Sequence, residues 1–331
     1  MKRAIYFCEN EENIKRVFAG GAEQTLKEAF ALSGQVYSRK DLGKEDFSDV
    51  EAVFSTWGMP HLEREEIKNY FPSLKALFYA AGSVQPFARP FLEEDVRVFS
   101  AWKANAVPVV EYAVAEILLA NKGFYQLISR TKEDYEKATQ FFTHFKGNYQ
   151  AKVGILGDGA IGGEVIRRLK EHSLEILVYS ITMSEERAKE LNVKRASLEE
   201  IFKECDVISN HLANNPKTVG IIGKSLIDSM KPYSTFINTG RGAQVDEKAL
   251  ANKLALDPTV TAVLDVTNPE PPAKNSPLLS LPNAILTPHI AGSAGNEVQR
   301  MAEYMAEESA RAFRGEDCPF EVTMKMLETM A

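Results

Sequence analysis

The sequence predicts an α/β protein made of two domains, each with a parallel sheet covered by helices. Short apolar runs typical of strands alternate with longer runs typical of helices through most of the chain. A fresh series of strand-like runs begins near residue 151, after a long helical segment. The 331 residues suffice for about two domains of roughly 150 residues each. These observations predict two α/β units joined by a helical connector.

The N-terminal part of the chain predicts four strands and two helices before the connector. The strands are expected at residues 3–7, 50–55, 74–79 and 96–100, and the helices at 23–33 and 64–70. A long helical segment is then expected to begin near Pro108, because proline is favoured in the first helical turn, and to run to residue 124.

The second series of strands has clearer helix start signals between its members. Strands are expected at residues 151–156, 174–179, 206–211, 234–239, 260–266 and 283–287. Ser197 with Glu200 three residues later fits a capping box, and Asp246 fits an N-cap. A last helix is expected over residues 296–314.

Composition excludes several classes of function. The net charge of −7 argues against an extended surface for nucleic acid or an anionic membrane, because both need a basic footprint. The three cysteines are far apart and form no Cys/His cluster, so neither a disulfide framework nor a metal site is expected. The apolar runs are too short for a signal peptide or a membrane span. We therefore expect a soluble cytoplasmic protein.

A glycine turn, GDGAIG, joins the strand expected at 151–156 to a helix. Gly157 fits the tight turn, Gly159 the close approach of a pyrophosphate, and Gly162 the packing of helix against strand. The free N–H groups of the helix would favour an anion. Glycine turns also join strands to helices for structural reasons alone. With its flanking pattern, the turn predicts a doubly wound, Rossmann-like dinucleotide-binding domain.

Three further segments could carry chemistry at the ends of expected strands. Arg241 lies between glycines, Glu270 lies in a proline-rich loop after Asp265, and His289 follows Pro288. Each has a simpler interpretation when taken alone: a solvated turn arginine, an exposed loop glutamate, and a hydrogen-bonded core histidine. Ligands of open α/β sheets bind at the carboxyl ends of the strands, and all three segments are expected there.

With these motifs in this order, the sequence resembles the D-isomer-specific 2-hydroxyacid dehydrogenases, of the phosphoglycerate or glycerate dehydrogenase type. The likeness includes LKALFYAAGSV, NAVPVVEYAVAEILLA, the glycine turn, FINTGRGAQVDEKAL, LDVTNPEPP and NAILTPHIAGS. It implies two Rossmann-like domains with a cleft between them. The dinucleotide-binding domain would span residues 104–292, and residues 1–103 and 293–331 would form a discontinuous substrate-binding domain.

The resemblance implies that NAD(P)H and a 2-keto acid, or the reverse pair, exchange a hydride. His289 would be the general acid/base, a role that suits imidazole because it gains and loses a proton near neutral pH. Glu270 would fix the ring's tautomer, and Arg241 would bind the substrate's oxygens through charge-assisted bonds.

The resemblance also assigns binding residues. The substrate carboxylate would meet Gly82, Ser83 and Val84. The cofactor-binding residues would be Gly157, Gly159, Ala160, Ile161, Gly162, Ser180, His211, Thr239, Asp265 and Gly292. We expect a small-molecule 2-keto or 2-hydroxy acid as substrate, a homodimer formed through the connector helix, and neither nucleic acid nor membrane as partner.

The chain departs from the family pattern at three positions. Ser180 stands where an acid usually holds the ribose, so a barrier to NADP is missing; the cofactor is NAD or NADP, and the lack of an adjacent arginine favours NAD. Ala213 replaces a proline, and Gln85 replaces an aspartate. Two alternatives stay open: formate dehydrogenase, which carries glutamine where this chain has Glu270, and a dinucleotide-sensing scaffold of the corepressor type.

Overall fold

The computed structural model describes residues 1–328, and the chain divides into two compact units. Unit 1 comprises Met1–Ala106 together with the chain from Ser293 onward, and unit 2 comprises Val107–Gly292. The first boundary therefore falls inside helix α5, Trp102–Ala120. Each unit has its own sheet and its own buried core.

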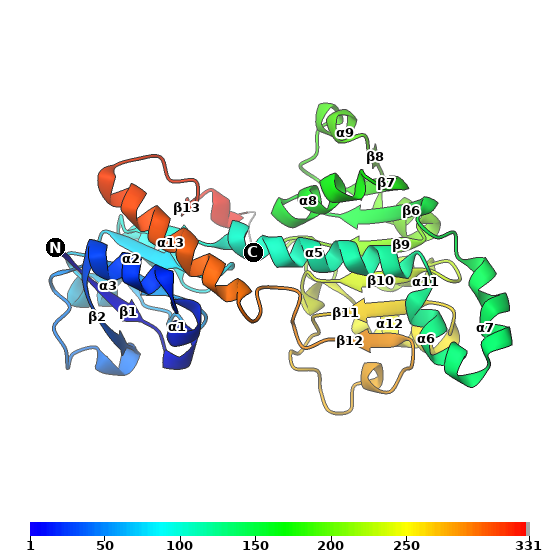
Figure 1. Ribbon diagram of the computed structural model, residues 1–331, viewed down its shortest axis with the longest axis horizontal. Helices are drawn as coiled ribbons and strands as arrows, with labels where there is room; N and C mark the ends of the chain where they lie inside the picture. The colour runs from blue at the N-terminus through cyan, green and yellow to red at the C-terminus, as the bar shows by residue number, and fades with distance from the viewer. Residues whose placement is uncertain (329–331) are drawn as a thin grey trace. The chain divides into compact units, whose positions relative to one another are not determined.

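Unit 1 is built on a six-stranded sheet in the order β13-β5-β4-β3-β1-β2 (Figure 1). Its strands are β1 (Lys2–Phe7), β2 (Phe30–Tyr37), β3 (Val50–Ser55), β4 (Ala76–Tyr79), β5 (Arg97–Ser100) and β13 (Glu321–Val322). All neighbours are parallel except β13, which pairs antiparallel with β5. The sheet thus takes its last strand from the far end of the chain.

The helices of unit 1 lie on both faces of this sheet. They are α1 (Glu11–Val17), α2 (Gly21–Ala29), α3 (Arg64–Tyr70), α4 (Ala88–Glu93) and α13 (Glu297–Arg314). Helix α13 packs beside α1 and α2, as Figure 1 shows in orange against blue. Its Met301, Ala302 and Met305 are buried in the same aromatic-rich core as Phe54, Phe78 and their neighbours. Unit 1 is complete only with this helix.

Unit 2 is built on a seven-stranded, wholly parallel sheet in the order β12-β11-β10-β9-β6-β7-β8. The strands are β6 (Tyr149–Leu156), β7 (Ser173–Tyr179), β8 (Lys194–Arg195), β9 (Val207–Asn210), β10 (Thr235–Asn238), β11 (Thr261–Leu264) and β12 (Ala284–Leu286). The chain moves outward in one direction from β6 to β8 and in the other from β9 to β12. The direction of winding reverses between β6 and β9.

Alternating side chains place a separate core on each face of the second sheet. Ile155 and Val178 pack with helices α5, α8 and α9, whereas Leu156 and Leu177 pack with α10, α11 and α12. The helices of the unit are α6 (Phe124–Glu133), α7 (Tyr135–Phe141), α8 (Ala160–Leu169), α9 (Glu185–Leu191), α10 (Leu198–Glu204), α11 (Lys224–Asp228) and α12 (Glu247–Leu256), besides α5. The predicted class of two doubly wound α/β sheets is confirmed.

Most predicted elements are found, but the helix expected over residues 23–33 is wrong at its end. Helix α2 stops at Ala29, and Phe30–Tyr37 forms β2, which pairs with β1. Phe30 and Leu32 are buried while Ala31 and Ser33 are exposed, which is the period of a strand.

The connector helix begins earlier than predicted. Helix α5 starts at Trp102, so Pro108 lies in its second turn and not at its first position. Proline there removes one backbone hydrogen bond. The helix continues through Pro108 because residues before and after the proline, Ala104, Val109 and Val110, are buried. In the part of the chain that the structure describes, no helix combines the length and the apolar character needed to cross a membrane.

Candidate active site

The predicted site residues of unit 2 lie at one edge of its sheet. Because the strands are all parallel, the residues that follow them gather where the carboxyl ends meet. Gly157 follows β6, His211 follows β9, Thr239 follows β10, Asp265 follows β11, and His289 lies three residues after β12. The reversal between β6 and β9 is at this edge, where such folds bind ligands.

Of the three motif glycines of the turn, only Gly159, at the start of α8, has open space beside it, which is where the pyrophosphate of a dinucleotide would lie. At Gly157, whose φ is +91°, a Cβ atom would lie 2.9 Å from the carbonyl oxygen of His211. At Gly162, a Cβ atom would lie 1.9 Å from the Gly157 carbonyl oxygen. At Gly159 a Cβ atom would meet no described atom within 4 Å. Two glycines are needed for packing, and the third leaves open space at the start of α8, so the turn fits a pyrophosphate.

Ser180 follows β7 and is bonded to the glycine turn. Its hydroxyl donates to Asp158 and accepts from the backbone N–H groups of Thr182, at 3.1 Å, and Met183, at 3.2 Å. The Thr182 hydroxyl donates to the same Asp158 oxygen at 3.1 Å. Asp158 was not among the predicted residues. The sequence offered one signal for its importance: an acidic residue stands inside the glycine turn, while the end of β7 carries Ser180 and no acid.

His211 is buried between two hydroxyl groups. Its Nδ1 lies 3.2 Å from the Thr239 hydroxyl and its Nε2 lies 2.9 Å from the Ser209 hydroxyl. Burial lowers the pKa of His211 to about 4, because the charged ring would lose its hydration. The ring is therefore neutral at physiological pH. Its contacts with Ser209 in β9 and Thr239 after β10 link the carboxyl ends of the two strands.

A buried amide network supports the turn that carries Arg241. The side-chain oxygen of Gln244 accepts from the Arg241 backbone N–H at 3.1 Å and from Asn210 Nδ2 at 2.8 Å. Gln244 Nε2 donates to the carbonyl oxygens of Leu212 and Ala213, at 3.0 and 3.2 Å. Gln244 and Asn210 were missed from the sequence; Asn210 is the last residue of β9, and Gln244 lies in the turn after Arg241.

The guanidinium of Arg241 is held close to a carboxylate without being paired to it. Within residues 1–328, its side chain makes one hydrogen bond, from Nη1 to the Gly240 carbonyl oxygen at 2.7 Å. Burial lowers the pKa of Arg241, and the charge of Glu270 acts in the opposite direction. The guanidinium N–H groups that the Gly240 bond does not use suit an anionic ligand.

His289 and Glu270 form a hydrogen-bonded pair. His289 Nδ1 lies 2.6 Å from Glu270 Oε1, and both side chains are less than half exposed. The bond leaves Nε2 of the ring for another partner. With the charge of Glu270 acting on Arg241, the structure brings these three predicted residues together on separate loops.

Asp265 holds the loop that carries His289. Its Oδ1 accepts from the Thr287 hydroxyl at 2.7 Å and the Ile290 N–H at 2.8 Å, and its Oδ2 accepts from the Ala291 N–H at 2.9 Å. The Asp265 backbone oxygen accepts from the His289 N–H at 3.0 Å. These bonds hold His289 with a φ of +55°, a left-handed conformation uncommon outside glycine.

Gly82, Ser83 and Val84 belong to unit 1 and follow β4. Ser100 donates to the carbonyl oxygens of Ala81 and Gly82, at 3.0 and 2.7 Å. Across the described residues, the N–H groups of Gly82, Ser83 and Val84 find no acceptor. Three free N–H groups on consecutive residues suit an anion.

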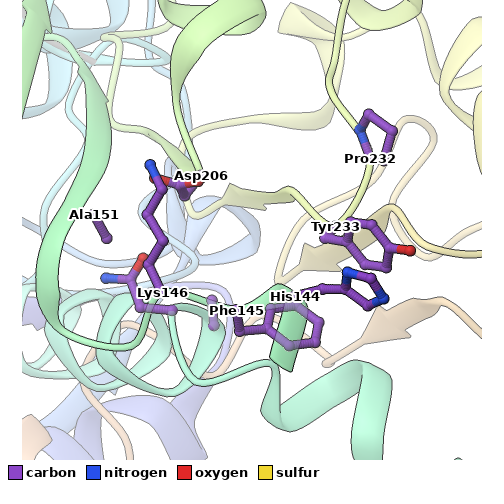
Figure 2. Close-up of a pocket in the computed structure, with 9 residues that line it drawn as sticks. His144, Phe145, Lys146, Ala151, Asp206, Pro232 and Tyr233 are labelled. Carbon is purple, nitrogen blue, oxygen red and sulfur yellow. The ribbon is translucent and has the colours of Figure 1, made fainter. Parts of the chain in front are cut away.

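A small cavity of about 40 Å³ lies elsewhere in unit 2 (Figure 2). Its lining comes from the end of α5, the start of β6 and the segments before β6, β9 and β10, and includes the stacked rings of His144 and Tyr233, whose centroids are 4.3 Å apart. These segments enter the strands at their amino ends, so the cavity is not part of the site. In residues 1–328, no three His, Cys, Asp or Glu side chains gather to hold a metal ion.

Comparisons with known proteins agree with this geometry. A family model described as "D-isomer specific 2-hydroxyacid dehydrogenase, NAD binding domain" matches residues 114–291. A D-3-phosphoglycerate dehydrogenase of Archaeoglobus fulgidus is 31% identical over 67% of this chain and 42% of its own length. A glyoxylate reductase of Korarchaeum cryptofilum is 37% identical over 54% of each chain. The chain belongs to the D-isomer specific 2-hydroxyacid dehydrogenase family.

Solved structures share the fold along nearly the whole chain. A D-mandelate dehydrogenase of Rhodotorula graminis matches with a TM-score of 0.79 at 19% identity, covering 97% of this chain and 98% of that one. A glyoxylate reductase of Paecilomyes thermophila matches with a TM-score of 0.75 at 22% identity, covering 98% and 99%. The aligned region covers only about half of the length of the sequence relatives quoted above.

Proposed function

We propose that the protein is an NAD(P)-dependent oxidoreductase that interconverts a 2-keto acid and a D-2-hydroxy acid. The observation that carries the proposal is the 2.6 Å bond between His289 and Glu270 beside the charge of Arg241. Membership of the family and the room at Gly159 support it. The unit that contains the glycine turn is proposed to bind the dinucleotide, and unit 1 to contribute to substrate binding.

In the direction of reduction, His289 would donate a proton to the keto oxygen. A dinucleotide held at the glycine turn would supply the hydride that the carbonyl carbon gains. Glu270 holds Nδ1, so the proton leaves from Nε2 and the ring regains one from solvent. The reverse reaction uses the neutral ring as the base.

The substrate's charge would be met by backbone and guanidinium donors. Arg241 has N–H groups beyond its bond to Gly240, and Gly82, Ser83 and Val84 offer three backbone N–H groups. A 2-keto acid carries a carboxylate next to the carbonyl, and such donors bind both. Because the chain has no arginine directly after Ser180, we favour NAD over NADP. The homodimer and the cytoplasmic location stay predictions.

The test is His289→Ala, assayed with a panel of 2-keto acids and both NADH and NADPH. We expect kcat to fall by roughly 10²–10⁴, the usual contribution of a positioned acid/base, while NADH binding measured by fluorescence persists. His172→Gln, a histidine after helix α8, is the control and should keep full activity. Unchanged turnover in His289→Ala would refute the assignment.

Two alternatives from the sequence are distinguished by the same panel. Turnover of formate, and of no keto acid, would favour formate dehydrogenase; Glu270 bonded to His289 speaks against it. Tight dinucleotide binding without turnover of any acid would favour the corepressor-type scaffold. The relatives and structures quoted above are named as dehydrogenases and reductases, so the scaffold is not favoured.

A further inference from the structure

We propose that Asp158, inside the glycine turn, supplies the carboxylate that selects NADH over NADPH in place of an acid at the end of β7. The inference rests on the proposed dinucleotide binding and adds the residue that decides between the two cofactors. In dinucleotide-binding sheets, an acid at the end of the second strand bonds the ribose hydroxyl and repels a 2′-phosphate. This chain has Ser180 at that place.

Asp158 lies beside the end of β7. The Gly157 N–H donates to the carbonyl oxygen of Tyr179, the last residue of β7, at 2.8 Å. The next residue, Asp158, accepts from the hydroxyls of Ser180 and Thr182, both through Oδ1. Neither bond uses Oδ2. The carboxylate is therefore fixed at the strand end with one oxygen left to accept from a ribose hydroxyl.

The hydroxyl groups around it are committed to this carboxylate. Serine and threonine hydroxyls near a strand end could otherwise donate to a 2′-phosphate. Here the hydroxyls of Ser180 and Thr182 bond to Asp158 and lie 3.1 Å from each other, and the Ser180 oxygen also accepts from two backbone N–H groups. A phosphate arriving at this place would meet acceptor oxygen atoms and not donors.

The arginines near Ser180 in sequence are engaged with other carboxylates. Arg187 pairs with Glu190 at 2.7 Å, and Arg195 pairs with Glu185 at 2.5 Å. Arg167, on helix α8, pairs with Glu164. An NADP site usually supplies an arginine to the phosphate. Each of these three guanidinium groups therefore has a carboxylate partner other than Asp158.

The test measures binding, so it does not depend on turnover. NADH and NADPH are titrated separately into the full chain, and each Kd is read from nicotinamide fluorescence. For the wild type we expect NADH to bind at least about tenfold more tightly than NADPH, which corresponds to about 1.4 kcal/mol, because the Asp158 carboxylate would repel the 2′-phosphate. Asp158→Asn keeps the shape and removes the charge, and should lower this ratio by about tenfold.

Two further variants separate charge from structure. Ser180→Asp in the Asp158→Asn background returns a carboxylate to the strand end and should restore the preference for NADH. Glu171→Gln removes an equal charge just past the far end of α8, about 15 Å along the helix and beyond the screening length, and should leave the ratio unchanged.

The binding results distinguish failure of the proposed function from failure of the role proposed for Asp158. Wild type that binds neither dinucleotide refutes the proposed function itself. Equal wild-type affinities, an unchanged ratio in Asp158→Asn, or equal losses for both dinucleotides refute the role of Asp158 while dinucleotide binding stands. A ratio that falls in Asp158→Asn and returns with Ser180→Asp supports it.

Discussion

His211 has a different pKa in the folded chain and in the unfolded chain. Its ring is buried between the hydroxyls of Thr239 and Ser209, and its pKa falls to about 4. In the unfolded chain the ordinary value of about 6.5 returns. Between these two values the unfolded chain binds a proton that the folded chain does not. Stability is therefore lost as pH falls from 6.5 towards 4.

We expect His211 to cause a loss of about 2 kcal/mol in the free energy of unfolding between pH 7 and pH 5. Urea unfolding at the two pH values measures it. His211→Gln should reduce the difference between the two pH values by about this amount, whatever its effect on stability at pH 7. His172→Gln should leave the difference unchanged. An equal pH dependence in wild type and His211→Gln would contradict the assignment.

Motifs located some residues of the site and missed others. Arg241, Glu270 and His289 were predicted because each follows an expected strand within a recognisable motif. Their roles stay predictions, although the structure places them together. Gln244 and Asp158 were missed because their importance lies in contacts with strands far along the chain. The spacing of residues within one sequence motif carries no information about partners on a distant strand.

At the scale of the element, the loop after β12 depends on one carboxylate. Asp265 accepts from one hydroxyl and two backbone N–H groups of this loop. In Asp265→Asn, an amide NH₂ group must replace one oxygen and would face an N–H donor. Such a mismatch leaves buried donors without an acceptor.

We expect Asp265→Asn to lower the free energy of unfolding by about 2 kcal/mol, and Thr287→Val, which removes one donor to Asp265 and the hydroxyl partner of Tyr112, by about 1 kcal/mol or less. Urea unfolding of both variants at pH 7 checks the order. A Thr287→Val loss equal to that of Asp265→Asn would mean that the hydroxyl, and not the backbone N–H groups, carries the stabilisation.

Helices and strands with strong local signals were predicted well. The capping box at Ser197 and the N-cap at Asp246 are both present. The strand β2 was missed because its first residues continue the apolar spacing of α2, and only its pairing with β1 decides its conformation. The start of α5 was predicted too late, near Pro108, because proline prefers the first turn of a helix. In the structure the burial of the preceding residues extends the helix back to Trp102.

At the scale of the whole molecule, unit 1 is assembled from two distant segments. Strand β5 pairs with β13, Arg97 bonds Glu321 at 2.9 and 2.6 Å, and the core includes Met301 and Met305 of α13. Unit 2 is formed by one continuous segment, and the helices that pack on both faces of its sheet lie within that segment. The two units therefore need different lengths of chain before they can fold.

We expect a chain that ends at Gly292 to keep unit 2 folded and to lose unit 1, because α13 and β13 would be missing. Limited proteolysis followed by mass spectrometry should leave a resistant fragment close to residues 107–292. The full chain should resist digestion in both units. Survival of the first hundred or so residues in the shortened chain would contradict this view.

The carboxylate in the glycine turn also bears on how the protein could evolve. Aspartate and asparagine codons differ by a single nucleotide, so one base change would remove the charge that Asp158 places beside Ser180. Such a change leaves the backbone of the turn and the room at Gly159 untouched. On the proposed role of Asp158, a single mutational step could thus let descendants of this gene accept NADPH alongside NADH, while the residues around His289 keep their chemistry.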